Sequence, residues 1–149
     1  MTILQQDIFS QIPRQLFASS AQNANLVSGH SMPTQTAVQR MLQLLPDITP
    51  QQRVMHIGAG TGYLSAILST QAAKVYAVER DAKLISDASQ RFASLGINNI
   101  QLLLADANNT LPKSETCQLI LATCLLHAYD QLLPALSDNG FLAVIEDEK

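Results

Sequence analysis

The chain has 149 residues, of which 47% are hydrophobic and 14% are charged, and its formal net charge is -3. This length suits one domain with a sizeable core, and the composition excludes a disordered chain. The acidic balance offers no basic surface to a phosphate backbone, and no apolar run approaches the roughly 18 residues of a transmembrane helix, so neither nucleic acid nor a membrane is expected as a partner.

The first third of the chain predicts helices and a long loop. Thr2–Ala18 mixes apolar and polar residues and contains Pro13, which indicates two short helices with a break between them. Residues 21–34 are polar and contain glycine and proline, which is typical of a loop. Gln35–Leu45 carries apolar residues at helical spacing, and prolines follow it, so we expect a helix that ends there.

From Arg53 onwards, short apolar strands alternate with helices. We expect Gly96 to end a helix and the Asn139-Gly140 pair to form a turn. The predicted strands are Arg53–Ile57, Lys74–Val78, Ile100–Leu104, Gln118–Ala122 and Phe141–Ile145, and the predicted helices are Tyr63–Gln71, Ala82–Leu95 and Tyr129–Ser137. This alternation predicts the α/β class: a Rossmann-like three-layer sandwich with a mostly parallel sheet of about five strands, helices on both faces and an N-terminal helical segment.

A glycine loop follows the first predicted strand. Ligands of such sheets bind beyond the carboxyl ends of the strands. The loop Gly58-Ala59-Gly60-Thr61-Gly62 allows a tight turn and lets the backbone approach a ligand closely. Tyr63 stands where the dinucleotide fingerprint has glycine or alanine, so the pattern favours a ligand without a diphosphate over NAD.

Acidic residues stand at the ends of the next two strands. Glu79 can accept hydrogen bonds from both hydroxyls of a ribose, and Asp106 can accept one from the exocyclic amine of adenine. Alternatively, Glu79 is a solvated charge at a strand end and Asp106 caps the turn that follows it. Together with the glycine loop, the two acids indicate an adenosine site without phosphates, which S-adenosylmethionine fits.

These motifs resemble those of the protein-L-isoaspartate O-methyltransferases, a family of class I S-adenosylmethionine-dependent methyltransferases. The resemblance covers nearly the whole chain, and the segments that carry it are Ile12–Phe17 (IPRQLF), Val54–Tyr63 (VMHIGAGTGY), Val75–Arg80 (VYAVER) and Leu95–Ile100 (LGINNI). The resemblance implies one domain, with a Rossmann-like cofactor-binding core in residues 51–149 and an N-terminal helical segment and substrate-side loop in residues 1–50.

The resemblance also implies a reaction and a set of site residues. The cofactor would be S-adenosylmethionine, and its methyl group would pass to the side-chain carboxylate of isoaspartyl residues in peptides or proteins, a repair step. The residues expected to bind the cofactor are Gly58, Ala59, Gly60, Thr61, Gly62, Glu79, Arg80, Asp106 and Ala107.

The sequence departs from the family at the first motif and in the substrate loop. His56 replaces an acidic residue and cannot attract a cationic cofactor as a carboxylate does; alternatively, it is a tolerated strand residue. In residues 29–36, Thr34 best matches a serine that would bring a hydroxyl to the substrate, so Thr34 is the candidate catalytic residue. Ser31 and Thr34 also suit a helix cap, and His30 is either an acid/base or a loop residue.

The last part of the chain differs as well. Where the family has Thr-Ala-Ala-Pro, this chain has Thr123-Cys124-Leu125-Leu126-His127, and His127 either faces a substrate or starts a surface helix. The family continues with further strands, so Phe141–Ile145 would be an exposed apolar edge. We expect self-association, another chain or a missing C-terminal region to cover it.

Two functions remain open at this point. One is a methyltransferase of the isoaspartyl type; the other is a degenerate methyltransferase fold that acts as a binding or regulatory module with weak cofactor binding or none. Residues 1–10 show no secretory signal, and Cys117 and Cys124 fit neither a disulfide framework nor a zinc site, so a cytoplasmic location and no metal are expected.

Overall fold

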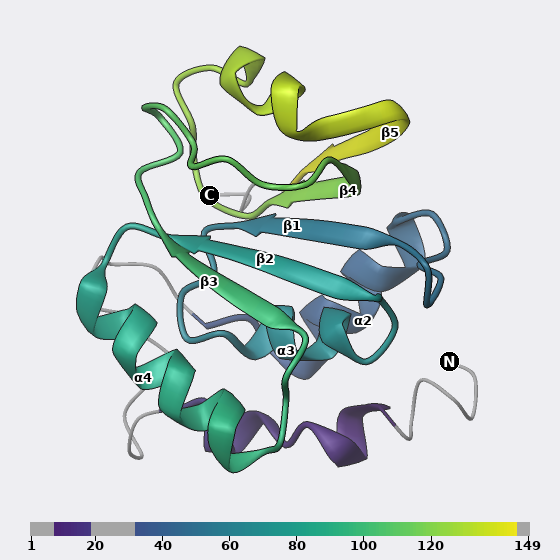
Figure 1. Ribbon diagram of the computed structural model, residues 1–149. Coiled ribbons are helices and arrows are strands. Elements are labelled where there is room, and N and C mark those ends of the chain that lie inside the picture. Colours follow the sequence, from purple (N-terminus) through teal and green to yellow (C-terminus); the bar gives the residue numbers. More distant parts are fainter. Residues whose placement is uncertain (1–7, 19–31, 146–149) are drawn as a thin grey trace.

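The centre of the molecule is a five-stranded sheet in the order β3-β2-β1-β4-β5, in which every neighbouring pair is parallel (Figure 1). The structure is a computed structural model that describes residues 8–18 and 32–145. The strands are β1 (Arg53–Ile57), β2 (Lys74–Glu79), β3 (Ile100–Leu104), β4 (Cys117–Ala122) and β5 (Leu136–Val144). The predicted α/β class is confirmed, and the central strands are continuously apolar because both faces of the sheet are covered.

Three α-helices cover one face of the sheet. They are α2 (Gln35–Leu44), α3 (Tyr63–Ser69) and α4 (Ala82–Ser94) (Figure 1). The N-terminal segment that contains a 3-10 turn, η1 (Arg14–Leu16), packs on the same face. The rings of Phe17, Tyr63 and Phe92 meet in this core, with centroids 5.7 and 6.4 Å from that of Phe17. The predicted N-terminal helical segment therefore packs against the helices of the sheet; its first part, residues 2–7, lies outside the described residues.

The second face is covered by a 3-10 helix, η2 (Asp130–Ala135), and by the irregular segment 105–116. The predicted helix Tyr129–Ser137 is wrong in type and length. Pro134 lies inside η2 and lacks the N–H that an α-helix would need there, and β5 begins at Leu136. The predicted turn at Asn139-Gly140 is found as a bulge inside β5 rather than as a break before it: Leu136 pairs with Cys117, the regular pairing with β4 resumes at Phe141 and Leu119, and Asn139 has a φ of 61°.

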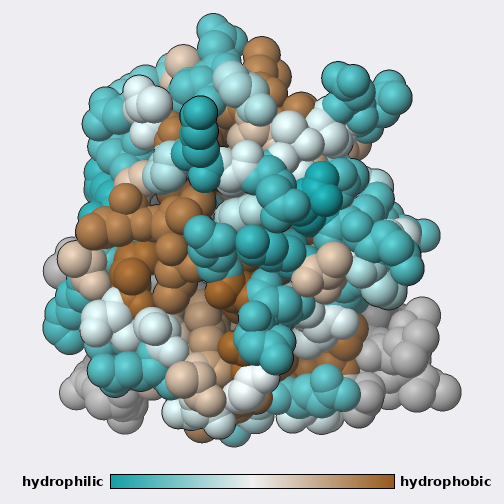
Figure 2. All heavy atoms as spheres, in the orientation of Figure 1, coloured by the Kyte–Doolittle hydropathy of each residue, from teal (hydrophilic) through white to brown (hydrophobic). Residues whose placement is uncertain are grey.

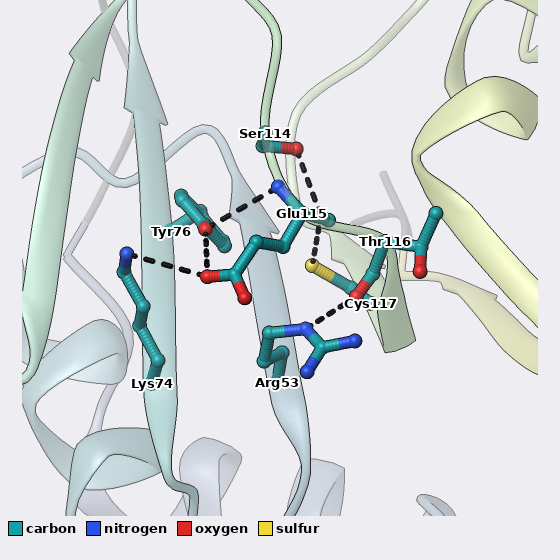
Figure 3. Close-up of polar contacts among 7 residues, drawn as sticks. All are labelled: Arg53, Lys74, Tyr76, Ser114, Glu115, Thr116 and Cys117. Carbon is teal, nitrogen blue, oxygen red and sulfur yellow. Dashed lines mark hydrogen bonds and ion pairs between the residues drawn. The ribbon is translucent and has the colours of Figure 1, made fainter.

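The loop that leads into β4 is fixed at the amino ends of the strands. The Tyr76 hydroxyl donates to Glu115 Oε1 at 2.8 Å, and Lys74 Nζ lies 3.6 Å from the same oxygen (Figure 3). Arg53 Nε donates to the carbonyl of Thr116 at 2.6 Å. These contacts lie at the end of the sheet opposite the glycine loop, so they stabilise the fold and leave the carboxyl ends of the strands accessible.

Within the described ranges, no helix is long and apolar enough to cross a membrane.

Candidate functional site

A cavity of about 560 Å³ opens at the carboxyl ends of the central strands. Hydrophobic side chains gather on the left of the molecule, where the strands end, with polar side chains around them (Figure 2). The structure brings together every predicted site residue except Gly62; those that line the cavity are Thr34, Gly58, Ala59, Gly60, Thr61, Glu79, Arg80, Asp106 and Ala107.

The glycine loop follows a path that only glycine adopts easily. Gly58 and Gly62 have φ values of 88° and 91°. A Cβ on Gly58 would lie 2.8 Å from the Cβ of Cys124, and the N–H groups of Gly58 and Ala59 both donate to the carbonyl of Val78. Gly62 instead packs against Phe92 where the loop enters α3. The loop is thus tied to β2 on one side and pressed against the segment after β4 on the other.

The carboxylate of Glu79 holds the loop in place. Its Oε1 accepts from the Gly60 N–H at 3.0 Å and its Oε2 accepts from the Asp81 N–H at 2.7 Å. Each carboxylate oxygen has a further lone pair that can accept a hydroxyl. Glu79 is therefore bound into the loop rather than being a freely solvated charge, and it still lines the cavity.

Asp106 and Thr34 each have a local partner as well as a place on the cavity wall. Asp106 Oδ1 accepts from the Asn108 N–H at 3.0 Å, so the predicted turn cap is confirmed. Thr34 Oγ1 accepts from the Ala37 N–H at 3.1 Å, so the predicted helix cap is confirmed too. His30 and Ser31 lie outside the described residues.

His56 is buried in β1 and joins two hydroxyls across the floor of the cavity. Its Nδ1 lies 2.8 Å from Ser65 Oγ in α3, and its Nε2 lies 2.8 Å from Thr123 Oγ1 beyond β4. Burial lowers the pKa of His56 to about 4, so the imidazole is neutral at pH 7. The sequence identified this position as a departure from the family, but its two partners became visible only in the fold.

Acidification is expected to destabilise the protein through His56. Its pKa is about 4 in the fold and near 6.5 when unfolded, so between these pH values the unfolded chain binds more protons and unfolding is favoured. The stability contributed by neutral His56 is present above pH 6.5 and lost as the pH falls to about 4, a loss of about 3 kcal/mol. Urea unfolding at pH 7 and pH 4.5 measures this loss as a change in the free energy of unfolding. The His56→Gln variant should lose clearly less stability between these two pH values. An equal loss in both proteins would contradict this assignment.

Several residues of the cavity were not predicted from the sequence as cofactor ligands. Ala37 and Met41 come from the apolar face of α2, and Cys124 and Leu126 come from the segment after β4. His127, considered as a possible substrate contact, lines the cavity and is exposed. The apolar spacing of α2 was a visible signal of burial, but nothing in it indicated that the buried face adjoins a ligand site.

The titratable groups of the cavity wall include the carboxylates of Glu79 and Asp106 and the imidazoles of His56 and His127, and its thiol is that of Cys124. Burial raises the pKa of Cys124, and it raises that of Cys117, the first residue of β4, to about 11, so both thiols are protonated at neutral pH. In the part of the chain that the structure describes, no cluster of His, Cys, Asp and Glu could hold a metal ion. The geometry suits binding and orientation of a ligand more than proton transfer.

Solved structures share this fold. A protein-L-isoaspartate O-methyltransferase aligns with 97% of the chain at a TM-score of 0.81 and 20% identity, and the aligned part is 51% of that protein. A protein from Plasmodium falciparum described as a putative protein-L-isoaspartate O-methyltransferase, in complex with S-adenosyl-L-homocysteine, aligns with 99% of the chain at a TM-score of 0.79 and 15% identity. At these identities the likeness supports the Rossmann-like fold alone.

Sequence comparison gives the family. A protein-L-isoaspartate O-methyltransferase from Hahella chejuensis is 33% identical over 147 residues, which cover 93% of this chain and 70% of that protein. One from Cereibacter sphaeroides is 34% identical over 98 residues, or 44% of its length, so the chain spans less than half of some curated relatives. The family model of protein-L-isoaspartate(D-aspartate) O-methyltransferase matches residues 4–143. The chain therefore belongs to the protein-L-isoaspartate(D-aspartate) O-methyltransferase family.

Proposed function

We propose that this chain binds S-adenosylmethionine in the cavity and transfers its methyl group to the side-chain carboxylate of isoaspartyl residues in peptides or proteins. The observation that carries the proposal is the order of three elements along one wall. Asp106 and the glycine loop come just after β3 and β1, and Glu79 is the last residue of β2, the strand between them. An adenine, its ribose and the atoms beyond the 5′ carbon can lie across the strand ends in the same order.

The residues present fit this cofactor. Both oxygens of Glu79 accept backbone N–H groups and still have a lone pair each for the two ribose hydroxyls. Asp106 lines the cavity and can accept a hydrogen bond from the amine of adenine, and the missing side chains of Gly58 and Gly60 let a ligand lie against the backbone. The Plasmodium falciparum protein of the same fold, described in complex with S-adenosyl-L-homocysteine, supports this choice of ligand.

The chemistry needs orientation rather than a strong acid or base. S-adenosylmethionine supplies an electrophilic methyl carbon, and its transfer to a carboxylate oxygen forms a C–O bond and breaks a C–S bond without moving a proton. Thr34 lies at the start of α2 on the cavity wall, and its hydroxyl can donate to an acceptor carboxylate while its oxygen caps the helix. Holding the acceptor in line is then the main contribution of the protein to the rate.

Calorimetry and a peptide assay test the proposal. We expect S-adenosylmethionine and S-adenosyl-L-homocysteine to bind with one-to-one stoichiometry. We also expect an isoaspartyl peptide to be methylated, whereas the same peptide with a normal aspartyl linkage is not. Absence of binding at millimolar ligand would contradict the whole proposal, and methylation of both peptides alike would contradict the assigned acceptor.

A second candidate function is a binding or regulatory module that has the fold but does not turn over. The observation in its favour is the neutral His56 in place of the acidic residue of the first motif, because it removes a charge that would hold a cationic cofactor. Binding of S-adenosyl-L-homocysteine without methyl transfer to any carboxylate peptide would favour this function over the enzyme.

We further propose that β5 forms an interface with a second copy of the chain. Among the described strands β5 pairs with β4 alone, and the exposed fractions of Phe141 and Val144 are 47% and 37%. An apolar strand with unpaired backbone groups favours addition of another strand.

A concentration-dependent dimer is therefore expected in size-exclusion chromatography with light scattering. The Phe141→Lys variant should remain monomeric, because the charge would have to be buried between two edges. Leu44→Lys, at an exposed leucine of α2, is the matched control and should still dimerise. A wild-type chain that stays monomeric at all concentrations would rule out this interface.

A further inference from the structure

The N-terminal segment is hydrogen-bonded to the main chain just before α2. Arg14 Nε donates to the carbonyl of Pro33 at 2.8 Å, and its Nη2 donates to the carbonyl of Met32 at 3.1 Å. A guanidinium presents its N–H donors in a planar fork of fixed geometry, so the two bonds together define where both carbonyls lie relative to Arg14. The next residue is Thr34, the N-cap of α2.

Arg14 is itself held in place by the aromatic core. It begins the 3-10 turn η1, and the Phe17 N–H donates to its carbonyl at 2.9 Å. Phe17 is fully buried, and its ring centroid lies 5.7 Å from that of Tyr63, the first residue of α3 after the glycine loop. Burial raises the pKa of Tyr63 and the charge of Arg14 opposes that rise, an effect that requires the guanidinium to lie near the phenol. A continuous set of contacts therefore joins the glycine loop to the start of α2.

Methyl transfer needs the two ends of this set of contacts in a fixed relation. This step rests on the proposed function, in which the cofactor lies against the glycine loop and Thr34 donates to the acceptor carboxylate. Thr34 Oγ1 accepts from the Ala37 N–H at 3.1 Å, so its proton remains available for a bond into the cavity. The cap fixes this side chain relative to α2, but it does not fix α2 relative to the glycine loop.

The hydrogen bonds of Arg14 supply the second constraint. Val38 is buried in the core and also holds α2, but apolar packing has no direction, whereas hydrogen bonds depend on angle as well as distance. A displacement of about 1 Å between reacting groups can lower a rate by as much as a hundredfold. The placement of residues 32–34 therefore matters for the reaction even where it matters little for the stability of the fold.

From these contacts we infer that Arg14 is a positioning residue for methyl transfer. It sets the position of Thr34 relative to the glycine loop, and so it aligns the acceptor carboxylate with the methyl carbon. Arg14 is not among the residues that line the cavity, so it acts through Thr34 rather than on a ligand. Its loss lowers kcat and leaves the binding of the cofactor unchanged.

Steady-state kinetics with an isoaspartyl peptide test this role in the full chain. Arg14→Met removes both donors and keeps an unbranched side chain. We expect kcat to fall by about tenfold or more, whereas the dissociation constant of S-adenosyl-L-homocysteine, measured by calorimetry, should change by less than about twofold. The matched control is Arg53→Met. Arg53 Nε also donates to a main-chain carbonyl, that of Thr116 at 2.6 Å, but at the opposite end of the sheet, so kcat of this variant should equal that of the wild type.

A double-mutant cycle distinguishes positioning from general destabilisation. Thr34→Val removes the hydroxyl through which Arg14 acts, so adding Arg14→Met to it should lower kcat by less than about twofold more. A purely structural role of Arg14 would lower kcat by the same factor with threonine or valine at position 34. Arg14→Lys keeps the charge and can still donate to a carbonyl, so it should lose less activity than Arg14→Met.

The outcomes separate this inference from the proposed function. If the wild type methylates no isoaspartyl peptide, the proposed function fails and the inference fails with it. If the wild type is active and Arg14→Met keeps the wild-type kcat, weakens ligand binding as much as it lowers kcat, or lowers kcat equally in both backgrounds, only the inference fails. Should Arg14→Met not fold, as judged by circular dichroism, Arg14→Lys takes its place in both comparisons. Should Thr34→Val have no measurable activity, the comparison with Arg53→Met decides.

Discussion

Replacing Glu79 by glutamine is expected to weaken the binding of S-adenosyl-L-homocysteine by about a hundredfold or more. The carboxylate accepts two backbone N–H groups, from Gly60 and Asp81. A glutamine amide has one acceptor oxygen, so its NH₂ group would face one of these N–H donors. The variant therefore loses the geometry of the glycine loop together with an acceptor for a ribose hydroxyl. Calorimetry measures the change.

The matched control for Glu79 is Glu115→Gln. Glu115 is also a carboxylate with a short side-chain hydrogen bond, from Tyr76 at 2.8 Å, but it lies at the amino ends of the strands (Figure 3). We expect the Glu115→Gln variant to bind S-adenosyl-L-homocysteine with the same dissociation constant as the wild type. A folded Glu79→Gln variant that binds as tightly as the control would show that the cavity is not the adenosine site.

Gly62→Ala is expected to destabilise the protein strongly. The new Cβ would lie 2.7 Å from Cζ of Phe92 and 3.2 Å from the Cβ of Ala88, and the backbone φ of 91° disfavours any side chain. Both contacts lie in the buried layer between α3 and α4, where atoms cannot move aside freely. We expect the free energy of unfolding to fall by about 2–5 kcal/mol.

Gly96→Ala separates the two causes. Gly96 has a φ of 70° at the end of α4, but a Cβ there would meet no atom within 4 Å. Its substitution should cost only the left-handed conformation, about 1 kcal/mol. Urea unfolding measures the free energy of unfolding of both variants, and the difference between their losses is the cost of the contact with Phe92. Equal losses would mean that Phe92 moves away without cost and that the contact does not constrain the loop.

Much of the fold was predictable because its signals are local. The apolar runs of β1 to β4, the glycine loop and the helix ended by Gly96 each follow from residues that are close together in the sequence. The region after β4 was predicted less well. There Pro134 favours a 3-10 helix over an α-helix, and the left-handed Asn139 allows a bulge in β5. The position of this bulge depends on the pairing of β5 with β4, which is not a local feature of the sequence.

The sequence by itself determined the class of the domain and most of its candidate cofactor residues, since strand ends of a parallel sheet meet at one edge. The glycine loop, Glu79 and Asp106 could therefore be placed together without coordinates. Only the tertiary structure decided what surrounds them. Gly62 faces Phe92 rather than the cavity, and α2 supplies part of the wall. His56 joins Ser65 to Thr123, and these partners are 9 and 67 residues away in sequence. Such contacts arise from the packing of α3 and β4 against β1, and no local pattern encodes them.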